Sequence, residues 1–195
     1  SIILCLSFII CLSACSYNPP DGYAEEHHTY EEILKFAKGI DPNATVSKEY
    51  TDTTIDAWNR KFREYPATIN GIECHVSSVG DMVWNEGFLA GEFARQYYVI
   101  DTDYDYYLLE KITKEKQPTW HMRSDDLSEK YNWNGMVFVE TDCFGNTKLS
   151  EEELETIWQQ AYEIYKEYSK YPVRKEANFG VATPDVYYED EHIKI

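Results

Sequence analysis

One dipeptide, Asn70-Gly71, constrains the fold of this chain more than any other feature. Both central residues of a type I′ turn need positive φ, and Asn-Gly adopts that conformation readily, so the pair predicts a two-residue β-hairpin loop. The predicted register pairs these residues across the two strands: Ile69 with Ile72, Ala67 with Cys74, and Tyr65 with Val76.

The hairpin has one apolar face and one polar face. The polar side chains are Glu64, Thr68, Glu73, His75 and Ser77, whereas all six residues of the three pairs above are apolar. Alternation with a period of two is typical of a strand that has one face on a core and the other in water.

This register assigns a side to three residues of chemical interest. Cys74 is expected in the core and His75 outside it, because successive side chains of a strand alternate. For the same reason Cys74 and His75 cannot act on each other as nucleophile and base. Pro66 lies opposite His75, and its missing N–H predicts that its strand is at the edge of the sheet.

Two segments carry the start signal of a helix. Thr29 with Glu32 and Ser150 with Glu153 both fit a capping box, in which the two side chains satisfy each other's backbone N–H groups. Each is followed by apolar residues at helical spacing, and the second pattern continues to about Tyr171 before a proline ends it.

A third helix is expected over residues 103–116, where Tyr104, Leu108 and Ile112 would point inward, although a strand is the competing interpretation. Further strands are expected over residues 93–100, 136–142 and 178–182. Helices mixed with hairpins, without strict alternation, predict an α+β fold: a largely antiparallel sheet with about three helices packed on it, in a single domain.

The first 14 residues are uncharged and almost wholly apolar, which suits the apolar region of a secretory signal and is too short to span a bilayer. They end in Leu12-Ser13-Ala14-Cys15, which resembles the lipobox of bacterial lipoproteins. The resemblance implies cleavage between Ala14 and Cys15 and attachment of a diacylglycerol to the Cys15 thiol. Because neither Met nor a basic residue precedes the apolar run, the leader is expected to begin upstream.

These features divide the chain into three parts. Residues 1–14 are the predicted signal peptide, 15–28 a lipid anchor with a flexible tether rich in Pro, Gly and Glu, and 29–195 the folded domain. The expected location is therefore extracytoplasmic, with the lipid on Cys15 as the contact to a bacterial membrane. The net charge of −17 argues against a nucleic-acid partner, because binding nucleic acid requires a basic surface.

Several residue groups could carry chemistry, and none forms a complete motif. Asp101, Asp103 and Asp105 open like a calcium loop, but Tyr106 and Ile112 occupy positions where an EF-hand needs Gly and Glu. A strand that runs into an Asp-capped helix is the favoured interpretation, and no metal is expected, because the histidines lack partners at ligand spacing.

Cysteines and tryptophans leave alternatives open. Cys74 and Cys143 could form a disulfide or remain buried thiols. Four tryptophans near predicted turns could make a binding platform for a carbohydrate or a protein, or could simply fill the core. They are Trp58, Trp84, Trp120 and Trp133, with residues 84–87 expected to form a loop.

No nucleophile elbow and no phosphate-binding loop occur in the sequence, and no catalytic residue or cofactor is assigned. The sequence thus predicts a non-catalytic, membrane-anchored binding module for an unknown protein or carbohydrate. The alternative is a lipid-anchored hydrolase that acts on an envelope or imported polymer, which would need a cleft with two carboxylates about 5 to 10 Å apart.

Overall fold

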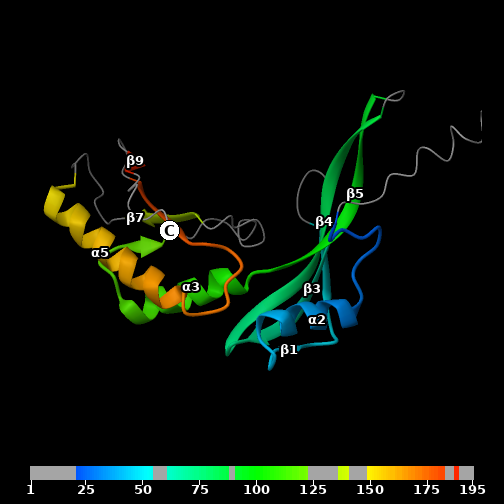
Figure 1. The fold of residues 1–195 in the computed structure, drawn as a ribbon, viewed down its shortest axis with the longest axis horizontal. Helices are drawn as coiled ribbons and strands as arrows, with labels where there is room; N and C mark the ends of the chain where they lie inside the picture. The colour runs from blue at the N-terminus through cyan, green and yellow to red at the C-terminus, as the bar shows by residue number, and fades with distance from the viewer. Residues whose placement is uncertain are drawn as a thin grey trace, which may run out of the picture.

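The computed structural model describes residues 21–54, 61–87, 91–122, 136–140, 149–182 and 187–188. Within these ranges the chain forms an α+β domain with two sheets (Figure 1). In chain order its elements are α2 (Tyr30–Ile40), β1 (Thr45–Val46), β2 (Thr51–Thr54), β3 (Lys61–Ile69), β4 (Ile72–Gly87), β5 (Gly91–Thr102), α3 (Tyr104–Lys116), β6 (His121–Met122), β7 (Met136–Glu140), α5 (Glu151–Tyr168), β8 (Asn178–Ala182) and β9 (Tyr187–Tyr188). The predicted fold class is confirmed, but the strands divide between two sheets.

The larger sheet is antiparallel throughout and has the order β1-β3-β4-β5, with β2 also paired to β3. β4 and β5 form a long hairpin that extends away from the helices (Figure 1). β4 continues through residues 84–87, so the loop expected around Trp84 is wrong, and the tryptophan lies within a strand.

The β3–β4 turn has the predicted geometry. Asn70 and Gly71 have φ values of 50° and 72°, as a type I′ turn requires. All three pairs in the predicted register are present, including Ala67 with Cys74. The turn therefore sets the strand register, and the register decides on which face of the sheet each nearby side chain lies.

Pro66 does not mark an edge strand, because β3 is flanked by β4 on one side and by β1 and β2 on the other. The Pro66 carbonyl accepts a hydrogen bond from the N–H of Ser47, 2.8 Å away, just after β1 ends. The N and C=O of a strand residue point to the same side, so the proline nitrogen faces the interval between β1 and β2. A missing N–H is tolerated there, because no strand residue on that side pairs with Pro66 and would accept a hydrogen bond from it.

The two faces of this sheet differ along its length. The predicted apolar face, from Tyr65 to Val76, belongs to the main core together with residues of all three helices. The opposite face is polar near the turn, but Phe62, Val79 and Tyr97 further along it are almost fully buried. Within the predicted polar face, the expectation of a solvated side chain fails at Ser77, which is fully buried next to this end.

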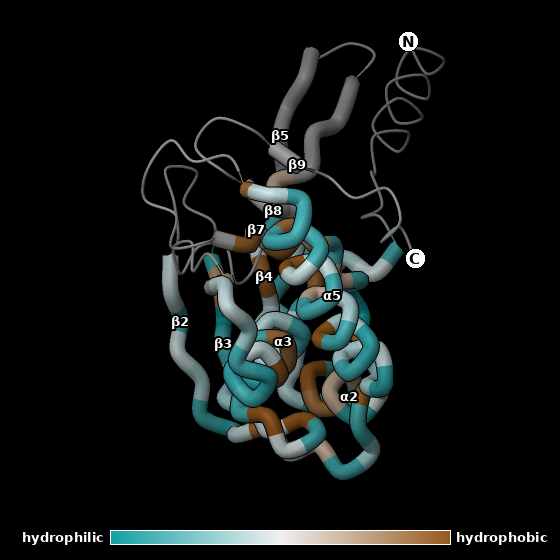
Figure 2. Tube along the Cα trace, turned by 90° about the vertical axis from the view of Figure 1, so that its left-hand side faces the viewer, coloured by the Kyte–Doolittle hydropathy of each residue, from teal (hydrophilic) through white to brown (hydrophobic). Residues whose placement is uncertain are grey.

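All three predicted helices are present, which excludes the strand alternative for residues 103–116. α2 and α5 both begin with the expected capping box. Each helix alternates apolar and hydrophilic stretches along its length, as expected of helices packed on one side (Figure 2). Among the described helices, none has the length and apolar character needed to cross a membrane.

The smaller sheet has the order β6-β7-β8-β9 and contains one parallel pair, β7 with β8. Parallel neighbours need a crossover connection, and α5 lies between these strands in the chain. Trp120, Val137, Ile157 and Phe179 are buried where α5 and this sheet join the core. Trp120 is 1% exposed, so it fills the core and forms no surface platform.

The end of the predicted tether is bound to the larger sheet. The backbone of Ala24 exchanges two 2.8 Å hydrogen bonds with Tyr98 on β5, and the His28 N–H donates to Ser78 Oγ at 3.0 Å. Tyr23 also donates its hydroxyl to Asp81, at 3.1 Å. The predicted tether is therefore not free up to His28, because its last residues are hydrogen-bonded to the sheet. Backbone pairing at the open edge of β5 does not require apolar side chains, so the composition of this segment does not reveal it.

Cys74 is a free, buried thiol in this structure, and Cys143 lies outside the described residues. Burial, and then the charge of Asp103, raise the pKa of the Cys74 thiol to about 12. We expect a small thiol reagent to label Cys74 at least ~100-fold more slowly in the folded than in the urea-unfolded protein, because the thiolate reacts and the site is covered. Peptide mapping by mass spectrometry distinguishes Cys74 from the other cysteines, and rapid native labelling would mean that β4 is turned over by one residue.

Candidate functional site

A buried carboxylate joins the end of β5 to the first part of β4. Asp103 follows the last residue of β5, and its side chain is 1% exposed. Its Oδ1 accepts the main-chain N–H of His75 at 2.6 Å, and its Oδ2 lies 3.0 Å from Nδ1 of the same residue. A carboxylate oxygen without a proton only accepts, so this contact is a hydrogen bond when Nδ1 of the imidazole carries the proton.

This arrangement follows from strands of unequal length. β5 stops opposite Val76, so towards the turn β4 is paired with β3 on one side and has no strand on the other. The Asp103 carboxylate takes the next N–H of β4, and the Thr102 hydroxyl donates to the His75 carbonyl at 2.7 Å. Side chains thus replace the missing ladder, and they fix both the backbone and the ring of His75.

The expected Asp cap on α3 is therefore only half right. Asp103 occupies the N-cap position, but its side chain makes no capping bond. The Tyr104 N–H donates instead to the Thr102 hydroxyl, at 3.2 Å. The carboxylate is committed to His75, so its role is to hold that residue rather than to start the helix.

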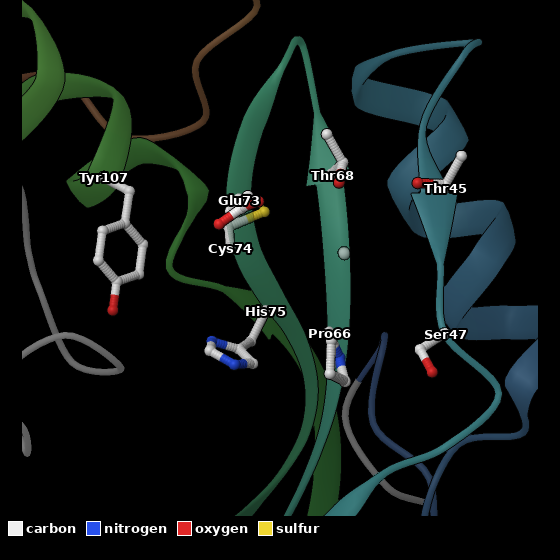
Figure 3. Close-up of a pocket in the computed structure, with 9 residues that line it drawn as sticks. Thr45, Ser47, Pro66, Thr68, Glu73, Cys74, His75 and Tyr107 are labelled. Atoms are coloured by element: carbon white, nitrogen blue, oxygen red, sulfur yellow. The ribbon is translucent and has the colours of Figure 1, made fainter.

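His75 lies on the wall of an open pocket of about 570 Å³ on the polar face of the sheet. Figure 3 shows Tyr107 of α3 on one side of the β4 side chains, with Thr45 and Ser47 beyond β3 on the other. The lining residues are Thr45, Ser47, Pro66, Ala67, Thr68, Glu73, Cys74, His75 and Tyr107. The His75 side chain is 39% exposed, so the outward position predicted for it is confirmed, and its ring is also anchored.

The pocket lies in a region of negative charge. None of its described lining residues is a Lys or an Arg, whereas Glu73 carries a carboxylate and Asp103 lies behind His75. Burial raises the pKa of Glu64, which lies on the same face, while His75 opposes that rise and Asp103 adds to it. A ligand here would meet hydroxyls, an imidazole, a phenol and carboxylate charge.

The described lining contains no activated nucleophile. The raised pKa of Cys74 keeps its thiol protonated at neutral pH, and the thiol lies with the core residues. The Ser47 hydroxyl oxygen accepts a hydrogen bond from the Glu49 N–H at 3.0 Å. Glu73 is the single carboxylate among the described lining residues, so they provide no pair for glycoside hydrolysis. The arrangement is suited to binding.

A second histidine cluster lies where the N-terminal segment crosses the sheet. Ser78 Oγ is 3.1 Å from His27 Nδ1, and Ser78 is fully buried. Burial, and then the charge of Arg63, lower the pKa of His27. A serine beside a neutral histidine can indicate nucleophilic catalysis, but this hydroxyl also accepts the His28 N–H and is closed to solvent. Its role is to hold the segment in place.

The three aspartates of the suspected calcium loop bind different groups of the protein and do not converge on one point. Asp101 Oδ2 lies 3.3 Å from Lys175 Nζ, Asp103 binds His75, and Asp105 accepts the N–H groups of Arg174 and Lys175. Within the described part of the chain, no three acidic, His or Cys side chains are grouped to hold a metal. The favoured interpretation, a strand that runs into a helix, is confirmed for the backbone.

The sequence predicts that His75 points outward, but it assigns His75 no role and does not predict the residues that surround it. Asp103 is predicted only as a helix cap or a loop ligand, because its link to β4 depends on where β5 ends. A polar pair, Thr102-Asp103, at the end of a strand was the available signal. Trp58, Trp133 and the Cys15 anchor lie outside the described residues.

Fold and pocket together define an α+β domain with an open polar pocket beside a hydrogen-bonded histidine. Comparison with known proteins finds no match: no family model matches the chain, nor does any curated protein or solved structure. The function must therefore be inferred from the site.

Proposed function

We propose that this chain is an extracytoplasmic lipoprotein, held to a bacterial membrane by the lipid on Cys15, that works as a non-catalytic binding module. The anchor rests on the apolar leader and the junction Leu12-Ser13-Ala14-Cys15. The strong negative charge supports the lipid, rather than the protein surface, as the contact with an anionic membrane.

The observation that carries the binding role is the pocket beside the His75–Asp103 pair. A buried carboxylate that fixes an imidazole at the rim of a cavity is costly unless it is fully hydrogen-bonded, and both oxygens of Asp103 are used. Positioned polar groups around a concave surface are typical of a ligand site. The pocket therefore supports recognition of a small polar group.

The alternative is a hydrolase that acts through paired carboxylates. Its specific requirement is a second carboxylate across a cleft from the first, and Glu73 has none among the described lining residues. The Asp103–His75 pair could orient a general base, but its described surroundings lack a nucleophile for that base to activate. These features favour binding over catalysis.

The anchor is tested by metabolic labelling with a radioactive fatty acid. We expect wild type and the Cys11→Ala variant to incorporate label, and Cys15→Ala to incorporate none, because only Cys15 occupies the lipobox position. Fractionation of the same cells should place the first two proteins with membranes. Equal label in Cys15→Ala and wild type would remove the anchor from the proposal.

The binding role is tested on the mature protein with a panel of soluble monosaccharides, disaccharides, amino-acid amides and diamines. Any compound held by the folded state alone raises the melting midpoint as its concentration rises. We expect at least one compound to raise the midpoint of wild type and to lose that effect in His75→Ala. A shift of the same size in both proteins would place binding outside the pocket and contradict the proposal.

A further inference from the structure

We propose that the pocket beside His75 takes a ligand with an ammonium group on a short alkyl chain. This inference rests on the proposed binding function and specifies the chemistry of that site. The group could belong to a free amine or to a lysine side chain of a peptide, and both present the same charge and the same three N–H donors.

Charge is the first argument. The Glu73 carboxylate lines the pocket, and the Asp103 carboxylate lies behind His75 at hydrogen-bonding distance. No described lining residue supplies a positive charge to neutralise them. Phosphate and carboxylate ligands would be repelled, whereas an ammonium group would gain attraction from each of these charges.

Two cations of the described chain have carboxylate partners of their own. Lys175 lies 3.3 Å from Asp101, and the Arg63 guanidinium makes two hydrogen bonds with Asp52, at 2.8 and 3.2 Å. Among the described residues that line the pocket, no Lys or Arg balances the charge of Glu73. A ligand cation can supply that charge.

The remaining lining suits the rest of such a ligand. The hydroxyl oxygens of Thr45 and Thr68 provide acceptors for ammonium N–H groups. The Tyr107 ring, on the opposite side from β1 in Figure 3, offers an aromatic surface for a cation or for methylene groups. A volume of about 570 Å³ admits an amine with a short alkyl chain.

The test compares N-acetyl-lysine methylamide with N-acetyl-norleucine methylamide, which has a similar alkyl chain and no ammonium group. Both are titrated into the mature protein and followed by amide chemical shifts. We expect the lysine compound to shift the signals of Glu73, His75 and Tyr107 and to bind at least about tenfold more tightly than the norleucine compound.

Glu73→Gln keeps the shape of the side chain and removes its charge, and it should weaken the lysine compound about tenfold. Glu110→Gln is the matched control, because Glu110 lies on α3 in an exposed pair with Lys114 at 2.9 Å and outside the pocket lining. A third titration with 1,5-diaminopentane separates the sources: equal or tighter binding supports a free amine, and weaker binding supports a peptide-borne lysine.

Equal binding of the lysine and norleucine compounds, or an unchanged affinity in Glu73→Gln, would overturn the inference. The proposed function would survive that result if a neutral member of the soluble panel shifted the same three signals. If neither the ammonium compounds nor the panel shifted them, inference and proposed function would both fail.

Discussion

Asp103→Ala should lower the free energy of unfolding by about 3 kcal/mol, because it leaves a buried main-chain N–H without its acceptor and releases an imidazole ring. The carboxylate accepts both groups of His75 at 2.6 and 3.0 Å, and it is 1% exposed. Urea unfolding of the mature protein at neutral pH measures the loss.

Two variants control this measurement. Asp103→Asn keeps an oxygen for the His75 N–H and should lose less stability, whereas Glu73→Ala, at an exposed position of β4, should stay within about 0.5 kcal/mol of wild type. If Asp103→Ala unfolded at the same urea concentration as Glu73→Ala, the hydrogen bonds of the carboxylate to His75 would not stabilise the fold.

Asp105→Ala should have a loss of similar size, about 2 to 3 kcal/mol. Asp105 lies in the first turn of α3 and is 1% exposed. Its carboxylate accepts the N–H groups of Arg174 and Lys175, 3.2 and 3.0 Å away, just after α5. Removing it leaves these donors unpaired and loosens the connection to β8.

The same residue predicts a pH dependence. Burial raises the pKa of Asp105 despite the hydrogen bonds from Arg174 and Lys175, which lower it. The unfolded chain then releases this proton at a lower pH than the folded protein, so the folded state binds more protons in that window. The contribution of Asp105 is therefore fully present below the unfolded pKa of 3.8 and is lost as pH rises through the raised folded value.

Asp105→Asn isolates this effect, because it keeps an acceptor and cannot titrate. The difference in unfolding free energy, wild type minus Asp105→Asn, should decrease as pH rises from about 3.5 to 7. A difference that increased with pH would mean that the folded state favours the ionised form and that the N–H groups outweigh burial.

Local signals predicted the parts of the fold that depend on neighbours in sequence. Asn70-Gly71 gave the turn and its register, and Thr29 and Ser150 marked the helix starts within one residue. In each case a backbone requirement, positive φ or an unsatisfied N–H, is met by residues within a few positions. Such requirements can be read from a single sequence.

The candidate site was less predictable, because it depends on non-local pairing. Asp103 meets His75 only because β5 ends opposite Val76, and no local pattern fixes that end. Pro66 is tolerated inside the sheet because it faces the gap between β1 and β2, and where those two strands pair with β3 is not a local property of the sequence. The docking of Ala24 on Tyr98 likewise joins residues far apart in the chain through backbone atoms alone.

The most direct test of the account is the protonation of the His75 ring, because the pocket depends on its bond to Asp103. Long-range ¹H–¹⁵N spectra of the mature protein, with His75→Gln to assign the signals, report which ring nitrogen carries a proton. A protonated Nδ1 at pH 8, lost in Asp103→Ala, is the expected result. A neutral ring with its proton on Nε2 alone, unchanged in Asp103→Ala, would show that Asp103 does not hold His75 and would contradict the proposed site.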